Sequence, residues 1–354
     1  MLKERHVKWS ASRILLLWGG LAVGGWMGAG ARSLDARQQQ QSQQQSQQQQ
    51  SLPQIGKSPE GKKEEAERAA ARSSAHHFDR VVIIVLENAD YEVASRDKNL
   101  AELAQKGASF TNFHALFHPS YPNYLGMVAG RDFGVHNRAR YLADRQVDFP
   151  ADAAHKTIAD ELIASGLDFK QYAEELPEGN CPFQIGSQHV AEKRGDYVRR
   201  HVPFLSFREV QEKWCDRVVR ADSSKDNNWF VQDAMKGLVA YNFYTPNMNH
   251  DGHNTNVQIA GAWIRNFLDK TFPEKLRVGT LVVVTFDESG GNADNRIFTL
   301  FLGDMVKPAG EQDPQVLSRR YDHYSVLRTV EENFGLPPLA PGDRNAEAIT
   351  GIWK

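Results

Sequence analysis

The 354-residue chain has little of the features that mark several specialised classes of protein. Its two cysteines are too few for a disulfide-built scaffold or a cysteine-rich zinc module. Its 42 lysines and arginines are balanced by 44 aspartates and glutamates, and the net charge of −2 argues against a protein that wraps nucleic acid. It lacks repeated long apolar runs, and its mean hydropathy of −0.54 excludes a polytopic membrane protein. With 41% hydrophobic residues, it still has enough apolar material for a sizeable core.

Residues 1–31 have the pattern of an export signal. Four cations within residues 1–13 precede an apolar run over residues 14–31, which ends in the small residues Ala-Gly-Ala. A signal peptide that is cleaved and a signal anchor that is kept are the two alternatives, since the run is close to the minimum length of a membrane span. We therefore expect export to the periplasm or beyond the cell, with membrane attachment only through residues 14–31. Without residues 1–31, whose four cations and one glutamate sum to +3, the mature chain would carry −5.

Residues 32–77 have the composition of a linker. Every residue from Gln38 to Gln50 is Gln or Ser, and residues 58–72 are dense in Lys, Glu, Arg and Ala. Neither stretch has enough large apolar side chains to offset the entropy of ordering, so we expect a disordered segment. Residues 78–354 then suit a single catalytic domain.

Apolar strand patterns alternate with helical patterns over residues 78–354. Four β-branched, apolar runs predict strands, at residues 81–86, 239–244, 281–286 and 298–302. Helical periodicity lies over residues 100–106, 157–165, 257–268 and 325–334. This alternation predicts an α/β fold with a mainly parallel central sheet and helices on both faces.

Polar residues follow three of the expected strands, as residues 87–90, 247–253 and 287–291. In parallel sheets a ligand binds beyond the carboxyl ends of the strands, so these segments should meet at one edge. Carboxylate and imidazole ligands together suit Zn²⁺, Mn²⁺ or Fe, whereas a set of oxygens alone suits Mg²⁺ or Ca²⁺. Each segment alone could be a helix N-cap or a turn, but three at one edge predict a metal site.

Ser120 is a candidate nucleophile in the segment His-Pro-Ser-Tyr-Pro-Asn-Tyr, residues 118–124. Pro119 and Pro122 fix the backbone around it, at an expected helix start whose N–H groups suit a phosphate. A serine oxygen bound to a metal needs no neighbouring histidine base, because the cation lowers the pKa of the hydroxyl. From these residues alone, an N-cap role for Ser120 is an equal alternative.

Together these segments resemble the bacterial phosphoesterase and acid-phosphatase family of the alkaline phosphatase superfamily, which includes the non-haemolytic phospholipases C. The resemblance covers most of residues 78–354. Five blocks in one order carry it, and they are residues 82–88, 107–112 with 118–125, 246–254, 283–291 and 321–334. As a set they are specific for the family and only weakly specific for a substrate.

The resemblance implies that Ser120 is the nucleophile and forms a phosphoserine intermediate that water then hydrolyses. It implies a divalent metal that holds the Ser120 oxygen and four further ligands, which are Glu87, Asn88, Asp287 and Glu288. The 33 residues between positions 87 and 120 leave room for one helix and a return to the same sheet edge.

The resemblance also implies a half of the site that carries imidazoles. Asp251, His253 and His323 would either bind a second metal or bind the leaving group, with an unligated histidine as the general acid. Related two-metal enzymes have an aspartate four residues before the histidine, and this chain has Asn249 before His253, so we expect one metal and doubt a second. Asn123 would either hydrogen-bond a phosphoryl oxygen or belong to the helix start.

The resemblance thus predicts an exported, metal-dependent phosphatase that acts on small phosphomonoesters. A phosphodiesterase or phospholipase C of the same fold is the first alternative, and a tethered binding protein without turnover is the second. A sulfatase is disfavoured, because Tyr124 stands where a Ser-x-Pro-x-Arg sequence would need arginine.

Two further features carry smaller expectations. An export signal favours a disulfide between Cys181 and Cys215 over two free thiols. The run Arg199-Arg200-His201 could line a phosphate entrance, but a solvated charge run is its commoner interpretation. Tyr172 and Glu174 resemble family sequence near the cleft, and we assign them no role.

Overall fold

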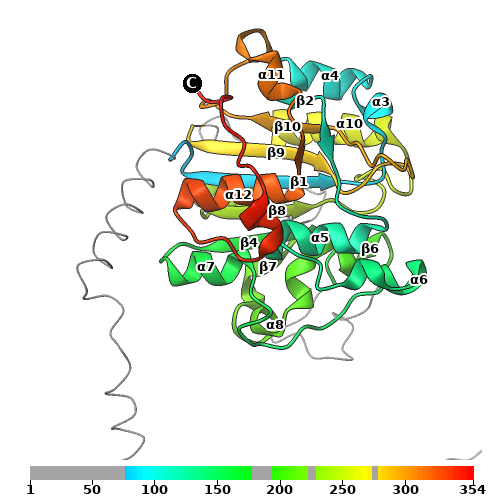
Figure 1. The fold of residues 1–354 in the computed structure, drawn as a ribbon, viewed down its shortest axis with the longest axis vertical. Coiled ribbons are helices and arrows are strands. Elements are labelled where there is room, and N and C mark those ends of the chain that lie inside the picture. Colours follow the sequence, from blue (N-terminus) through cyan, green and yellow to red (C-terminus); the bar gives the residue numbers. More distant parts are fainter. Residues whose placement is uncertain (1–75, 178–192, 222–228, 273–277) are drawn as a thin grey trace, which may run out of the picture. The chain divides into compact units, whose positions relative to one another are not determined.

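The computed structural model describes residues 76–177, 193–221, 229–272 and 278–354 (Figure 1). The expected signal at 1–31, nearly all of the expected linker at 32–77, and Cys181 lie outside these ranges. Cys215 is bonded in a disulfide. Within the described ranges, no helix is long and apolar enough to cross a membrane.

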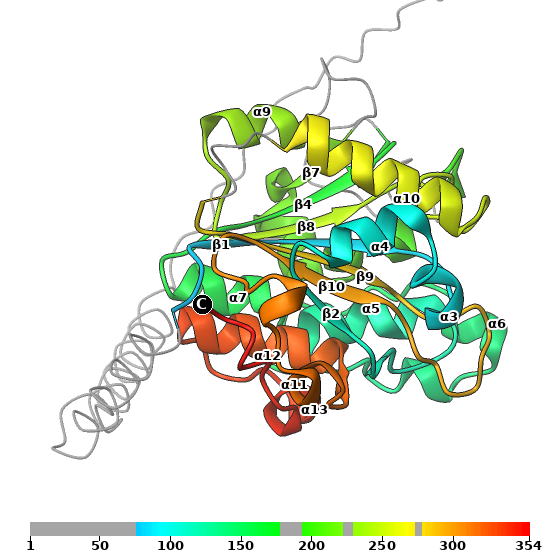
Figure 2. The same ribbon diagram turned by 90° about the horizontal axis from the view of Figure 1, so that it is seen from above.

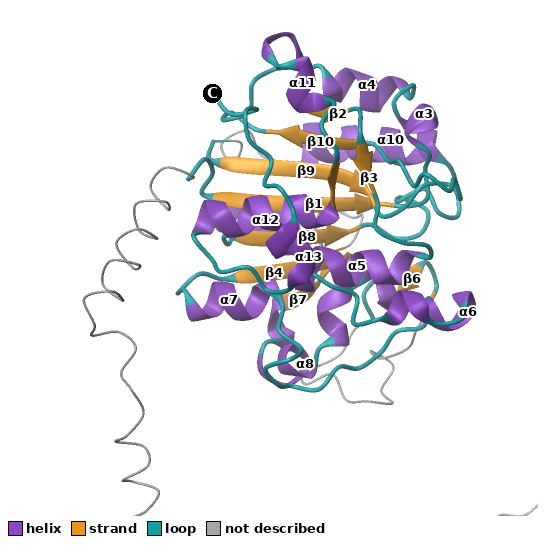
Figure 3. Cartoon of the chain, in the orientation of Figure 1, coloured by secondary structure: helices purple, strands orange, loops and turns teal. Residues whose placement is uncertain are grey.

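A seven-stranded sheet forms the centre of the described structure, in the order β2-β10-β9-β1-β8-β4-β7 (Figure 3). The pairings among β9, β1, β8, β4 and β7 are parallel, and β10 runs antiparallel to both β9 and β2. The strands are β1 (Arg80–Leu86), β2 (Ala108–Phe110), β4 (Phe169–Glu174), β7 (Val218–Ala221), β8 (Tyr241–Thr245), β9 (Thr280–Phe286) and β10 (Thr299–Leu302). The expected, mainly parallel sheet is confirmed.

Helices cover both faces of this sheet. Figure 2 shows α4 (Lys98–Ala104), α9 (Trp229–Lys236) and α10 (Val257–Asn266) on one side. The other side carries α5 (Ser120–Ala129), α7 (Ile158–Ala164) and α12 (His323–Phe334). The other α-helices in the described ranges are short, namely α3 (Tyr91–Ala94), α6 (Arg140–Ala143), α8 (Arg208–Lys213), α11 (Pro314–Leu317) and α13 (Pro341–Asn345). All four helices expected from periodicity are present, with ends shifted by a few residues.

Two small sheets complete the strand structure. In one of them β11 (Tyr321–Asp322) pairs parallel with β3 (Phe113–His114). In the other, β5 (Lys193–Arg194) pairs antiparallel with β6 (Tyr197–Val198). The first of these joins the segment before α5 to the start of α12.

The pairing of β1 with β9 sets the position of the residues that follow both strands. Every residue of β9 is buried, as are the last six of β1, which is why both read as continuous apolar runs. Their register runs from Arg80 opposite Thr280 to Leu86 opposite Phe286. The chain therefore leaves both strands at the same point of the sheet edge.

The strand β4 was not expected, because its sequence is of mixed polarity. Gln171 and Glu174 interrupt any apolar run, yet both are buried and hydrogen-bonded to residues distant in sequence. Gln171 accepts a hydrogen bond from the backbone N–H of Phe204, and Glu174 accepts one from the hydroxyl of Tyr244. Such strands depend on tertiary partners that a local pattern does not reveal.

Glu331 of α12 is a buried acid away from the sheet edge. Its carboxyl lies near Asp343 of α13, and the guanidinium of Arg328 is 3.8 Å away. Burial, and after it the neighbouring Asp343, raise the pKa of Glu331 to about 10. The side chain is thus protonated at neutral pH in the folded protein.

We expect Glu331→Gln to flatten the pH dependence of stability. The unfolded chain releases this proton near pH 4.5, whereas the folded chain keeps it up to about pH 10. Between these values the free energy of unfolding falls as pH rises, by at most about 1.4 kcal/mol per pH unit. Glutamine has the shape of the protonated acid and does not titrate, so the variant should lose less stability between pH 5 and pH 8.

Urea unfolding at both pH values measures this difference. Glu332→Gln, which removes a half-exposed acid from the same helix, is the matched control. Equal losses in the wild type and the Glu331 variant would contradict a protonated Glu331.

Candidate active site

Four carboxylates meet at the edge of the sheet where β1, β8 and β9 end. Glu87 follows β1, Asp251 lies in the loop after β8, and Asp287 and Glu288 follow β9. All four are buried, with exposed fractions of 1%, 0%, 0% and 6%. The backbone N–H of Asp287 donates to the carbonyl of Leu86, and that of Glu87 donates to the carbonyl of Asp251. The strand ends thus bring together the acids that the sequence places after them.

Ser120 lies at the start of α5 and reaches this cluster. Its hydroxyl donates to Glu288 Oε1 at 3.2 Å and is 3.3 Å from Glu87 Oε2. The side chain is buried, and the N-cap of α5 is Pro119, so the alternative role of Ser120 as the N-cap is wrong. Ser120 therefore lies among the carboxylates predicted around it, and its role as nucleophile stays a prediction.

Several buried polar atoms in the cluster have no hydrogen-bond partner within the described residues. They are Asn88 Oδ1, Asp251 Oδ2, Asp287 Oδ2 and His201 Nε2. Buried acceptors are rarely left unsatisfied, because each such group costs free energy in the folded state. A set of carboxylate and amide oxygens with one imidazole nitrogen matches the donors of a divalent cation site.

The raised pKa values of the buried carboxyl groups also indicate a cation site. Burial, reinforced by Asp287 and Asp251, raises the pKa of Glu87 well above its usual value. Burial likewise raises the pKa of Asp251 well above its usual value, and burial with Glu288 raises that of Asp287 to about 8. Such clusters of like charge are costly unless protons or a cation offset them. The residues present therefore fit a divalent metal.

His201 is a site residue that the sequence analysis missed. Its imidazole stacks on the ring of Tyr124, with centroids 4.9 Å apart and an interplanar angle of 12°. Nε2 lies 3.4 Å from Glu87 Oε1, and Nδ1 lies 3.8 Å from Asp251 Oδ2. The three side chains could hold one ion, since their ligand atoms lie within 4.8 Å of one another. Burial lowers the pKa of His201 well below its usual value, which keeps the ring neutral, the form that binds metals.

The commoner interpretation of residues 199–201 as a solvated charge run is wrong. Arg199 and His201 are 5% and 1% exposed. Arg199 donates to Asp148 Oδ1 at 2.7 Å, and Arg200 Nε lies 3.1 Å from Asp144 Oδ1. A turn (Arg199–His201) delivers these side chains into the structure, which no local pattern of charges indicates.

Asn123 makes four hydrogen bonds within the loop before α5. Its Oδ1 accepts from the backbone N–H groups of Leu116 and Phe117, both at 2.9 Å. Its Nδ2 donates to the carbonyls of Phe117 and Pro119 at 2.8 and 3.2 Å. The amide is thereby fully engaged. Of the two roles considered, this geometry favours positioning the helix start over contact with a phosphoryl oxygen.

The two predicted histidines occupy different places. His253 is exposed beside Ser120, and its backbone N–H donates to Asp251 Oδ1 at 2.8 Å. His323 is buried, and its Nε2 donates to the carbonyl of Asp287 at 2.8 Å. Burial lowers the pKa of His323 to about 4, so its ring is neutral. His253 is thus the one placed to meet a leaving group, while His323 supports the backbone beneath Asp287.

His118 and Glu174 hold parts of the site in place. His118 Nδ1 contacts Glu288 Oε2, and its Nε2 donates to the carbonyl of Asn292 at 3.1 Å. The contact with Glu288 raises the pKa of His118. Glu174, at the end of β4, binds His250 Nδ1 at 2.5 Å and so fixes the loop that carries Asp251. Recognition of β4 as a strand would have placed Glu174 at the same sheet edge.

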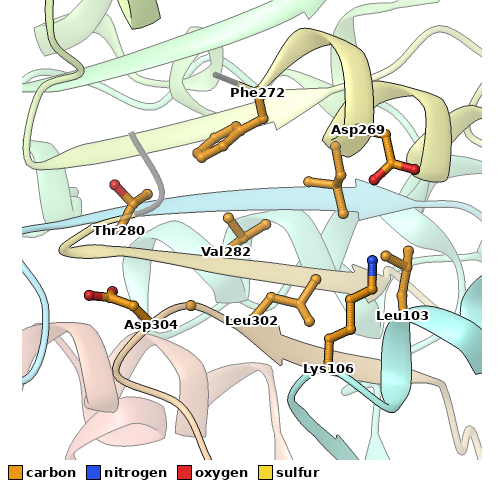
Figure 4. Close-up of a pocket in the computed structure, with 10 residues that line it drawn as sticks. Leu103, Lys106, Asp269, Phe272, Thr280, Val282, Leu302 and Asp304 are labelled. Carbon is orange, nitrogen blue, oxygen red and sulfur yellow. The ribbon is translucent and has the colours of Figure 1, made fainter. Parts of the chain in front are cut away.

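A cavity of about 490 Å³ opens over Ser120. Its lining consists of Asn88, Pro119, Ser120, Arg140, Tyr141, Asp144, Arg200, His253 and Glu288. A second cavity, of about 280 Å³, lies between α4, the segment that follows α10 and the strands β9 and β10 (Figure 4). Its lining is mostly apolar and includes none of the predicted site residues, so the chemistry belongs to the first cavity.

Comparison with known proteins finds relatives over most of the chain. The model of the Phosphoesterase family matches residues 94–337. The phosphate-repressible acid phosphatase of Penicillium chrysogenum is 34% identical over 277 residues, which are 77% of this chain and 63% of that protein. The phosphatidylinositol-3-phosphatase of Mycobacterium tuberculosis is 31% identical over 287 residues, which are 80% of this chain and 85% of that protein.

These matches differ in how much of each protein they cover. The chain spans 58% to 63% of the length of the fungal acid phosphatases it matches. The solved structure of a Vibrio parahaemolyticus protein in the alkaline phosphatase superfamily superposes with a TM-score of 0.49 at 16% identity. The match covers 75% of this chain and 68% of that one. Since the family model alone matches well over half of the 354 residues, the chain belongs to the Phosphoesterase family.

Proposed function

We propose that the protein is an exported, metal-dependent phosphatase that hydrolyses phosphomonoesters through a phosphoserine. The observation that carries this proposal is the Ser120 hydroxyl, held between Glu87 and Glu288 at the start of a helix and in the buried part of a cavity. The relatives named acid phosphatases support the choice of a monoester. The pattern of residues 1–31 and the disulfide at Cys215 support export, because disulfides persist in oxidising compartments.

Ser120, Asn88, Asp287 and Glu288 would hold the metal on the cavity side, together with Glu87. When bound, a divalent cation would supply positive charge to the phosphoryl oxygens and lower the pKa of the Ser120 hydroxyl. Asp251 and His201 lie on the far side of Glu87 and complete the set of donors near it. His118 fixes the orientation of the Glu288 carboxylate.

The chain's own groups account for the transfer. The Ser120 oxygen attacks phosphorus in line with the ester oxygen, and its proton passes to Glu288, whose Oε1 already accepts it at 3.2 Å. The N-terminus of α5 and the Arg200 guanidinium attract the phosphoryl oxygens. His253 at the cavity donates a proton to the departing alcohol.

The second half of the reaction regenerates the free serine. Water enters where the alcohol has left, and the now neutral His253 takes a proton from it as the oxygen attacks phosphorus. The Ser120 oxygen leaves with the proton held on Glu288. Each step inverts phosphorus, so the whole reaction retains its configuration.

Replacing Ser120 by alanine should abolish the trapping of labelled phosphoenzyme and lower kcat by about 10³-fold or more. Acid quenching after incubation with a ³²P-labelled monoester measures the trapped phosphoenzyme, and steady-state kinetics measure kcat. Ser165→Ala, at an exposed position after α7, is the control for removing one hydroxyl. Full turnover by Ser120→Ala would exclude Ser120 as the nucleophile.

Asp287→Ala should lower the amount of tightly bound metal, because it removes a buried carboxylate with an unpartnered oxygen. Elemental analysis of the dialysed protein measures this and identifies the ion among Zn, Mn, Fe, Mg and Ca. Asp216→Ala removes an exposed acid and serves as the control. Unchanged metal content in Asp287→Ala would contradict the ligand assignment, while a content near two ions that falls to one in His201→Ala would support a second site.

The choice of substrate class is tested with three esters assayed side by side. We expect faster turnover of 4-nitrophenyl phosphate than of bis(4-nitrophenyl) phosphate or a choline phospholipid. Preference for either diester would favour the phosphodiesterase or phospholipase C alternative. A folded, metal-loaded protein that turns over none of the three would favour the tethered binding protein.

A further inference from the structure

The cavity over Ser120 has room for more than a phosphoryl group. Its volume of about 490 Å³ falls within the range of sites that enclose a whole small ligand. Ser120 and Glu288 are its buried members, whereas Arg140, Tyr141 and His253 are exposed. The exposed part must therefore contact the portion of a substrate beyond the ester bond.

Two arginines line this cavity, and their surroundings differ. The Arg200 side chain is 15% exposed, lies 3.1 Å from Asp144 Oδ1, and lines the cavity together with the buried Ser120 and Glu288. It thus lies near the buried carboxylates and is suited to the phosphoryl group that is transferred. Arg140 is exposed and makes neither an ion pair nor a side-chain hydrogen bond within the described ranges.

Arg140 and Tyr141 stand together at the start of α6, which lies at the end of the sheet toward which β1 and β8 point (Figure 1). Tyr141 is 73% exposed, the highest value among the large hydrophobic side chains that the structure describes. An aromatic ring beside a cation at the mouth of a cavity can give a bound molecule both an apolar contact and an ionic contact. Both side chains line the cavity that contains Ser120.

We infer that Arg140 binds a second anionic group on the alcohol portion of the substrate. This inference rests on the phosphatase activity proposed above and adds a substrate class to it. The planar guanidinium forms paired hydrogen bonds with a carboxylate or a phosphate. The preferred substrates are then phosphomonoesters whose alcohol carries a further carboxylate or phosphate close to the ester.

A matched pair of substrates tests this assignment. Glycerol 3-phosphate and 3-phosphoglycerate share a three-carbon frame, and the second has a carboxylate where the first has a hydroxymethyl group. In Arg140→Gln we expect kcat/KM for 3-phosphoglycerate to fall by about tenfold or more, mainly through KM, as for loss of a hydrogen bond to a charged group. The value for glycerol 3-phosphate should change by less than about twofold. Arg145→Gln is the control, because this exposed arginine is close in sequence and does not line the cavity.

Two outcomes would overturn the inference while the phosphatase proposal stands. One is an equal loss on both substrates, which would assign Arg140 to the transferred phosphoryl group or to folding. The other is a kcat/KM for 3-phosphoglycerate that Arg140→Gln leaves unchanged. Turnover of 4-nitrophenyl phosphate, whose alcohol portion has no second anionic group, is the separate measure of phosphatase activity. Its absence in the wild type would overturn the proposed function and, with it, this substrate class.

Discussion

The burial of four carboxylates at one point is the constraint on which the site depends. It follows from the register of β1 and β9, which places Glu87 and Asp287 at the same edge, and from the loop after β8 that brings Asp251 beside Glu87. Like charges at this spacing repel strongly in a region that water does not reach. Four neighbouring donors are turned toward them, namely the hydroxyls of Ser120 and Tyr124 and the backbone N–H groups of Asn88 and His253. Oxygens of Asn88, Asp251 and Asp287 still have no hydrogen-bond partner in the described part of the chain, and this arrangement fits a cation.

The features of the site that depend on short stretches of sequence could be predicted from the sequence alone. Residues 81–86 and 281–286 read as strands because burial on both faces requires continuous apolar runs. Once they are strands in a parallel sheet, the acids that follow must share an edge. The position of Ser120 at a helix start likewise follows from the prolines on either side. These inferences need only short-range pattern and one rule of topology.

The parts that escaped prediction are those that depend on distant partners. Glu174 is the last residue of β4, and the polar Lys170 and Gln171 keep the sequence of this strand from having an apolar pattern. The buried Glu174 carboxylate is stabilised by hydrogen bonds with Tyr244 and His250, which lie elsewhere in the chain. His201 sits in a charged tripeptide whose normal environment is water. Only its stacking on Tyr124 and its approach to Glu87 make it part of the site. A local pattern of residue types predicts the average structure and burial of a segment. The burial of Glu174 and His201 depends instead on the residues that pack against them.

The same distinction applies to the number of metal ions. Doubt about a second ion rests on Asn249, which stands where related two-metal enzymes have an acid. In the structure the Asn249 amide donates to Asp196 Oδ2 at 2.7 Å, so this side chain contributes to the loop. An imidazole near Glu87 and Asp251 comes instead from His201, whose ring nitrogens lie 3.4 Å from Glu87 Oε1 and 3.8 Å from Asp251 Oδ2. The absence of an acid at position 249 therefore does not by itself decide how many metal ions the four carboxylates could hold, because His201 from another segment supplies a nitrogen beside two of them.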